Sequence, residues 1–136
     1  MDVTTAMLAD FAQVREGLLF VASGGVTRCY RDQLPAPLNV YLATVLELDR
    51  IEAEKVHELH VVVVDEDGQQ LAEIAGEIQL GSTQMMINEN LNVPIVFDLR
   101  NVPVERYGSI EIRLYVAREH RRTLPIWVLQ SAPAEG

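Results

Sequence analysis

The chain has 136 residues, 49% hydrophobic and 23% charged, and its 20 acidic and 11 basic residues give a formal net charge of −9. This length and apolar share predict one folded domain over residues 1–130, followed by a disordered tail at residues 131–136, and exclude wholesale disorder. The negative balance disfavours a nucleic-acid-binding protein, which needs clustered basic side chains to displace counterions. The single cysteine, Cys29, excludes an internal disulfide framework and a cysteine-based zinc site.

The apolar segments and the start of the chain bear on its location. No apolar run approaches the roughly 20 residues of a membrane span. The first residues, MDVTTAMLADF, carry Asp2 and no basic segment, unlike a secretory signal peptide. We therefore expect a soluble, cytoplasmic protein with no membrane partner and no nucleic-acid partner.

The N-terminal third has an irregular pattern. Short strands are predicted at residues 3–9, 18–22 and 26–31. Gly24 and Gly25 form a predicted turn or bulge before the last of these strands. Residues 10–15 have helical character over one or two turns.

The clearest strand signal follows residues 35–37, where two prolines favour extended backbone. An apolar row then alternates with a period of two along one face: Leu38, Val40, Leu42, Thr44, Leu46 and Leu48. Residues 49–56 predict one or two helical turns after this strand. Asp49 is the expected cap, because Glu52 follows it three residues later.

The second half of the chain continues with period-two strands. They are predicted at residues 59–64, 71–80, 93–99, 110–116 and 124–128. The acidic segment DEDG at residues 65–68 is typical of a hairpin turn. The polar residues 117–123 are predicted to form a second hairpin loop, and residues 81–92 a long irregular loop.

Eight or nine strands with no substantial helix predict an all-β fold. Sheets with one apolar face are stable when two of them pack together, which favours an antiparallel β-sandwich. An immunoglobulin-like or C2-like type is expected, with at most one or two short helical turns.

Candidate catalytic residues are few. Cys29 lies in a predicted strand beside Arg28, and a small hydrolase using Cys29 or His60 is the alternative hypothesis. His57 and His60, with Glu54 nearby, would form a metal site on a helix. On a strand, however, residues three apart point to opposite faces. We therefore expect a non-enzyme with no catalytic residue, metal or cofactor.

The acidic hairpin permits a second alternative. Asp65, Glu66 and Asp67 lie together at one predicted loop tip. Asp98 or Asn101 from another loop would have to join them, because calcium takes roughly six to eight oxygen ligands. A calcium-dependent module through Asp65 and Asp67 is thus an alternative to a plain, solvated hairpin turn.

Apolar side chains also occur on strand faces that a solvated sheet would leave polar. Four of them mark a candidate interface: Tyr41, Val45, Val62 and Trp127. If their strands share one sheet, these residues form an apolar patch, and we expect a homodimer or an unknown protein partner. The competing hypothesis is an intramolecular cover formed by residues 1–8 or by the loop at residues 85–87.

Several motifs carry a resemblance to a known family. Residues 7–28, MLADFAQVREGLLFVASGGVTR, contain an Ala-Asp dipeptide and a Gly-Gly turn in which Ser23 replaces a first glycine. The pattern continues at residues 35–38, 64–69 and 94–99. In these motifs the chain resembles an uncharacterised bacterial, mostly actinobacterial, family. The resemblance implies an all-β, cytoplasmic protein of unknown function, and we expect a non-catalytic binding or structural protein.

Overall fold

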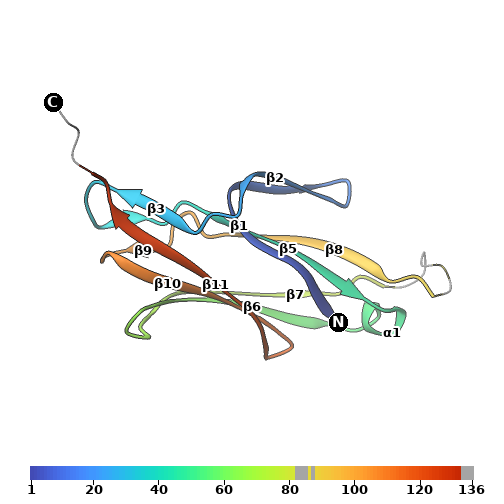
Figure 1. The fold of residues 1–136 in the computed structure, drawn as a ribbon. Helices are drawn as coiled ribbons and strands as arrows, with labels where there is room; N and C mark the ends of the chain where they lie inside the picture. Colours follow the sequence, from blue (N-terminus) through green and yellow to red (C-terminus); the bar gives the residue numbers. More distant parts are fainter. Residues whose placement is uncertain (82–85, 87, 133–136) are drawn as a thin grey trace.

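Two β-sheets stack face to face in the computed structural model of the protein, which describes residues 1–81, 86 and 88–132 (Figure 1). Buried apolar side chains from both sheets form one hydrophobic core between them. The predicted all-β, mainly antiparallel sandwich is therefore confirmed. An immunoglobulin-like or C2-like type stays a prediction.

The first sheet, called sheet A, has four antiparallel strands in the spatial order β2-β1-β5-β8. They are β1 (Asp2–Arg15), β2 (Leu18–Gly24), β5 (Tyr41–Leu48) and β8 (Leu91–Asp98). The predicted apolar row along β5 is confirmed, because each of its members from Leu38 to Leu48 is 2% exposed or less. Thr44 is the polar member of the row, and its hydroxyl donates to the Ile95 carbonyl at 2.8 Å, so this buried hydroxyl is paired.

The second sheet, sheet B, has five strands in the order β3-β11-β10-β6-β7. They are β3 (Arg28–Arg31), β6 (His57–Asp65), β7 (Gln70–Ile78), β10 (Gly108–Val116) and β11 (Glu119–Gln130). All pairs are antiparallel except β3 with β11, which is parallel. The two main sheets together contain nine strands, within the predicted eight or nine, and two further short strands bring the described total to eleven.

A two-stranded ladder and a short helix complete the described chain. β4 (Ala36–Pro37) pairs with β9 (Pro103–Val104), and α1 (Arg50–Ala53) follows β5. The Asp49 side chain accepts a hydrogen bond from the Glu52 backbone N–H at 2.8 Å, and the Glu52 carboxylate accepts one from the Asp49 N–H at 3.0 Å. This capping box confirms the predicted helical turn. No helix among the described residues is long and apolar enough to cross a membrane.

The prediction of helical turns at residues 10–15 is wrong. β1 continues through this segment to Arg15, and residues 11–15 pair with β2 in a hairpin. Glu16 and Gly17 form its two-residue turn, with φ of 52° and 75°. A six-residue segment has little helical stability of its own, so the hydrogen bonds of the hairpin ladder decide its conformation.

The second hairpin loop is shorter than the prediction of residues 117–123. Only Ala117 and Arg118 form the turn, with φ of 51° and 65°, and β11 already begins at Glu119. The polar residues after the turn belong to β11, where they pair with β10 and are mostly exposed. Residues 119–123 are polar because they are exposed to water, and not because their backbone is irregular.

The β1–β2 hairpin lies on the side of sheet A that faces away from sheet B (Figure 1). It contacts both β5 and β8, and the Phe11 ring packs edge-on against Tyr41 with centroids 5.7 Å apart. The predicted cover by residues 1–8 is wrong, since this segment lies within sheet A beside β5. The hypothesis of a cover by residues 85–87 falls largely outside the described residues, as does most of the predicted tail. Residues 82–85 and 87 of the predicted loop also lie outside them, and β8 already begins at Leu91, before the predicted end of that loop.

The buried row on β5 generates a stability prediction. Leu42→Ala should lower the free energy of unfolding by about 2–5 kcal/mol, because the fully buried side chain leaves a cavity that its neighbours fill incompletely. Leu80→Ala is the matched control, since Leu80 is 45% exposed, and it should change stability by no more than about 0.5 kcal/mol. Urea unfolding followed by circular dichroism measures both. Equal losses would mean that Leu42 is not in the core.

Candidate functional site

The two candidate catalytic residues lie in sheet B but on strands that are not neighbours. Cys29 is in β3 and His60 is in β6, with β11 and β10 between them. Three strand spacings amount to about 14 Å. A nucleophile and its base must lie within hydrogen-bond reach, so Cys29 and His60 do not form a catalytic pair.

Cys29 faces the core rather than solvent. Its residue is 9% exposed and belongs to the buried apolar cluster. Burial raises the pKa of its thiol, and the nearby Arg31 only partly opposes this effect. A thiol with a raised pKa carries little thiolate near neutral pH, which disfavours the hydrolase alternative.

His60 is half-buried on the outer face of sheet B, beside a shallow hollow. The hollow is lined by Glu58, His60, Ala75, Gly76, Glu77 and Arg118. No Ser, Thr or Cys is among these described residues, so the hollow offers His60 none of these nucleophiles to activate. His57 is buried, with Nε2 2.6 Å from the Glu52 carbonyl oxygen, so the two histidines point to opposite faces as predicted.

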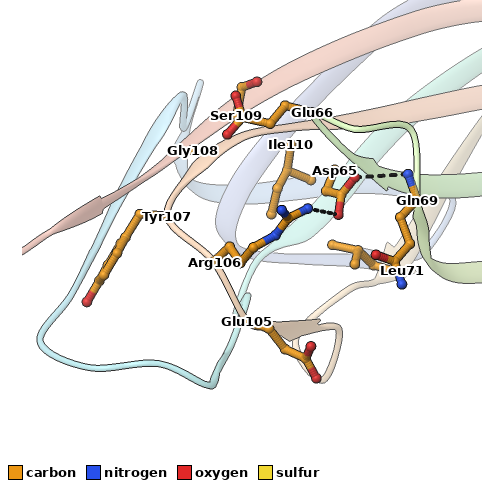
Figure 2. A pocket seen from close by; sticks show the side chains of 10 residues that line it. All are labelled: Asp65, Glu66, Gln69, Leu71, Glu105, Arg106, Tyr107, Gly108, Ser109 and Ile110. Carbon is orange, nitrogen blue, oxygen red and sulfur yellow. Dashed lines mark hydrogen bonds and ion pairs between the residues drawn. The ribbon is translucent and has the colours of Figure 1, made fainter.

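An arginine from another loop holds the acidic hairpin at residues 65–68 (Figure 2). Nη2 of Arg106 lies 2.8 Å from Asp65 Oδ2 and 2.7 Å from Asp67 Oδ2. Asp65 Oδ1 also accepts hydrogen bonds from the backbone N–H groups of Asp67 and Gln69, at 3.0 and 2.9 Å. The hydrogen bond from Arg106, supported by those from the two amides, holds the pKa of the Asp65 carboxyl below its usual value.

This pairing bears on the calcium alternative. The Arg106 guanidinium lies where a cation bound by Asp65 and Asp67 would have to lie. Asp98, the predicted additional ligand, is paired with Arg100 at 3.0 and 2.8 Å. Within residues 1–81, 86 and 88–132, no group of three His, Cys, Asp or Glu side chains is placed to hold a metal ion. Calcium binding at the hairpin would therefore require Arg106 to leave.

A small cavity lies beside Arg106, between the acidic hairpin and the start of β10 (Figure 2). Its volume of about 50 Å³ has room for one or two water molecules and is too small for a substrate. Gly108 forms part of its wall at a φ of 135°, and a Cβ there would collide with the Glu66 carboxylate. The Glu66 carboxylate is the end of a flexible side chain and could move aside, so it is the positive φ that favours glycine at this position.

The structure does not bring the four predicted interface residues together. Tyr41 and Val45 lie on β5 in sheet A, whereas Val62 lies on β6 and Trp127 on β11 in sheet B. The assumption that their strands share one sheet is wrong. Alternation of apolar and polar residues in the sequence indicates which face of a strand a residue lies on, but it does not indicate to which sheet the strand belongs. Tyr41 is also covered by Arg100, whose guanidinium lies 5.0 Å from the ring centroid.

Trp127 belongs instead to a different surface, on the outer face of sheet B. It is 48% exposed, and Tyr30 on the adjacent strand β3 is 54% exposed. In the parallel register Trp127 lies beside Arg28, and Leu129 lies beside Tyr30. We call these four residues the aromatic strip. The sequence places Tyr30 outward, next to the inward Cys29, but gives no sign that β3 pairs with β11.

Comparison with known protein families matches residues 4–129 to DUF6941, a family of unknown function, and the chain belongs to this family. The resemblance of its motifs to an uncharacterised family is thereby confirmed. A search of curated proteins finds no match.

The buried thiol gives a direct prediction. Native protein should react with Ellman's reagent far more slowly than a model thiol near neutral pH, since burial of Cys29 blocks the reagent and raises the pKa of the thiol. The rate should approach that of the model thiol in concentrated urea, where the side chain is exposed. Fast labelling of the native protein would contradict the assignment of Cys29 as a core residue.

The Arg106 ion pairs predict a pH dependence. The pKa of Asp65 is lower in the folded than in the unfolded chain, so its pairing stabilises the fold above the unfolded pKa and is lost as pH falls through the folded pKa. Arg106→Gln should therefore lower Tm at neutral pH. The gap to wild type should close as the pH falls below about 3.9, the ordinary aspartate value.

The matched control for this measurement is Arg28→Gln, which removes an exposed arginine for which the described residues show no ion pair. Its Tm should follow that of wild type across the pH range. Thermal unfolding followed by circular dichroism at several pH values measures all three proteins. A gap for Arg106→Gln that does not change with pH would show that Asp65 is not its stabilising partner.

Proposed function

We propose that this DUF6941 member is a non-catalytic interaction protein that binds a protein partner through the aromatic strip. The observation that carries the proposal is the exposure of Trp127 and Tyr30 on neighbouring strands of one sheet face. Nothing in the family description indicates catalysis or another specific activity.

The composition of the strip supports a protein partner. Tyr, Trp and Arg are enriched at the centres of protein interfaces and account for most binding hot spots, and the strip contains one of each. Strand backbone holds Trp127 and Tyr30 in place, because β11 and β3 are hydrogen-bonded to each other. The backbone of this surface is therefore already ordered before a partner covers it, which lowers the entropy cost of binding.

The geometry of the residues considered for a hydrolase supports the proposal that the protein is not a catalyst. Cys29 and His60 are separated by two strands, and the Cys29 thiol has a raised pKa. The cavity beside Arg106 accommodates water only. A net charge of −9 disfavours nucleic acid as the partner.

We also propose the cytoplasm as the setting of this interaction. The chain has one cysteine, which is buried, so its fold depends on no disulfide between its own cysteines. Such a protein suits a compartment that keeps thiols reduced.

Loss of the tryptophan tests the proposed surface. A partner captured from the source organism on immobilised wild-type protein is purified and titrated into the free protein. Trp127→Ala should weaken its binding about 30-fold or more, the effect of losing a hot spot of about 2 kcal/mol. The emission of Trp127, the only tryptophan, should shift to shorter wavelength when the wild type binds.

Ile51→Ala is the control for this titration, because Ile51 is 69% exposed but lies on α1, outside the aromatic strip. It should leave the affinity unchanged. A partner that binds Trp127→Ala as tightly as wild type would show that the aromatic strip is not the binding surface.

A further inference from the structure

The edges of the two sheets differ in how they oppose pairing with another chain. The main sheets end in β2 and β8 on sheet A and in β3 and β7 on sheet B. An exposed edge strand is a template for pairing, and proteins block it with charges, proline or shortness. Three of the four edges carry such a feature.

The three edge strands β7, β8 and β3 oppose pairing with another chain through charge, proline and short length. β7 carries Glu73 and Glu77, and β8 contains Pro94, which has no N–H to donate to a partner strand. β3 spans only four residues and has Arg28 and Arg31 at its ends.

β2 has none of these features. Residues 17–26, GLLFVASGGV, contain no charged residue and no proline. Leu18, Phe20 and Val21 are 62%, 47% and 37% exposed. In the described part of the chain the ladder partner of β2 is β1 alone, so its other edge is unpaired.

The charge pattern favours a second copy of this chain as the partner of that edge. Antiparallel self-pairing centred on Val21, the midpoint of β2, sets Phe20 opposite Ala22 and Leu18 opposite Gly24. No charged side chain meets another in this arrangement. Two copies with a net charge of −9 each repel one another, so they associate most easily where the contact surface carries no charge.

Charged side chains enter the same two-fold arrangement at β7 and β3. Self-pairing of β7 centred on its midpoint Ile74 sets Glu73 opposite Ala75 and Glu77 opposite Leu71, so each copy brings two acidic side chains into the contact. Self-pairing of β3 would set Arg28 opposite Arg31. Like charges directly opposite each other destabilise a strand pair.

We propose that β2 of one copy pairs antiparallel with β2 of a second copy across a two-fold axis at Val21, joining the two β1–β2 hairpins into one four-stranded ladder. Such an interface is isologous and closed, so it yields a dimer and not a filament. It lies on sheet A, and therefore does not rest on the function proposed for the aromatic strip of sheet B.

The test is the mass in solution by light scattering at tens of micromolar. Wild type should have twice the 15.2 kDa mass of the chain. Val21→Lys and Val21→Glu should each have the mass of a single chain, because the charged side chain meets its own copy at the axis. Val56→Lys is the matched control, since Val56 is 53% exposed and lies outside β2, and it should remain a dimer.

Mixing the two variants makes the test independent of a folding defect. Val21→Lys and Val21→Glu together should restore the mass of two chains, because opposite charges then meet at the axis. Trp127→Ala should remain a dimer, which separates this proposal from a dimer through the aromatic strip. A monomeric wild type, a dimeric Val21→Lys, a mixture that stays monomeric, or a dimer lost in Trp127→Ala would each overturn the proposal.

Discussion

Burial of alternating side chains from the inner strands, between the two sheets, is the interaction on which the rest of the structure depends. On β5 and β10 these rows are 2% exposed or less, and each buried Leu or Ile contributes about 1.5–3 kcal/mol relative to exposure. A slip of one residue in β5 would carry Glu47 into the core in place of Leu46, so the register is fixed. The same constraint sets the outward faces: Trp127 points away from the core because Ile126 and Val128 on either side are buried.

The charged side chains of the described residues lie outside the core, on the outer faces of the sheets and in the loops. The chain has ten arginines and one lysine, and arginine binds carboxylates through two nitrogens in a fixed geometry. Arg100 binds Asp98 in this way, and Arg106 bridges the two aspartates of the acidic hairpin. These pairs fix the loops at the ends of the strands. β2 takes no part in such pairing and, among the edge strands of sheets A and B as described, is the one without charge.

Features set by neighbours in sequence were predictable, and features set by distant segments were not. The β5 row, the Asp49 cap and the acidic turn follow from spacings of two to four residues. Arg106 lies 41 residues from Asp65, and nothing in the local pattern marks it as the partner. The sheet to which Tyr41 or Val62 belongs is likewise decided by pairing between distant strands. Residues 10–15 were predicted wrongly because the hairpin ladder overrides a weak local preference.

The two proposed surfaces are compatible because they lie in different layers of the sandwich. β2 belongs to sheet A, whereas Trp127 and Tyr30 lie on the outer face of sheet B. A dimer through β2 would therefore leave both aromatic strips free, related by the same two-fold axis. A partner with two binding sites would engage the second strip intramolecularly, and its overall affinity would exceed that for a single strip by about 10²–10⁴ where the geometry allows both contacts. Dimerisation through β2 would then raise the affinity for such a partner, although no residue of β2 belongs to the aromatic strip.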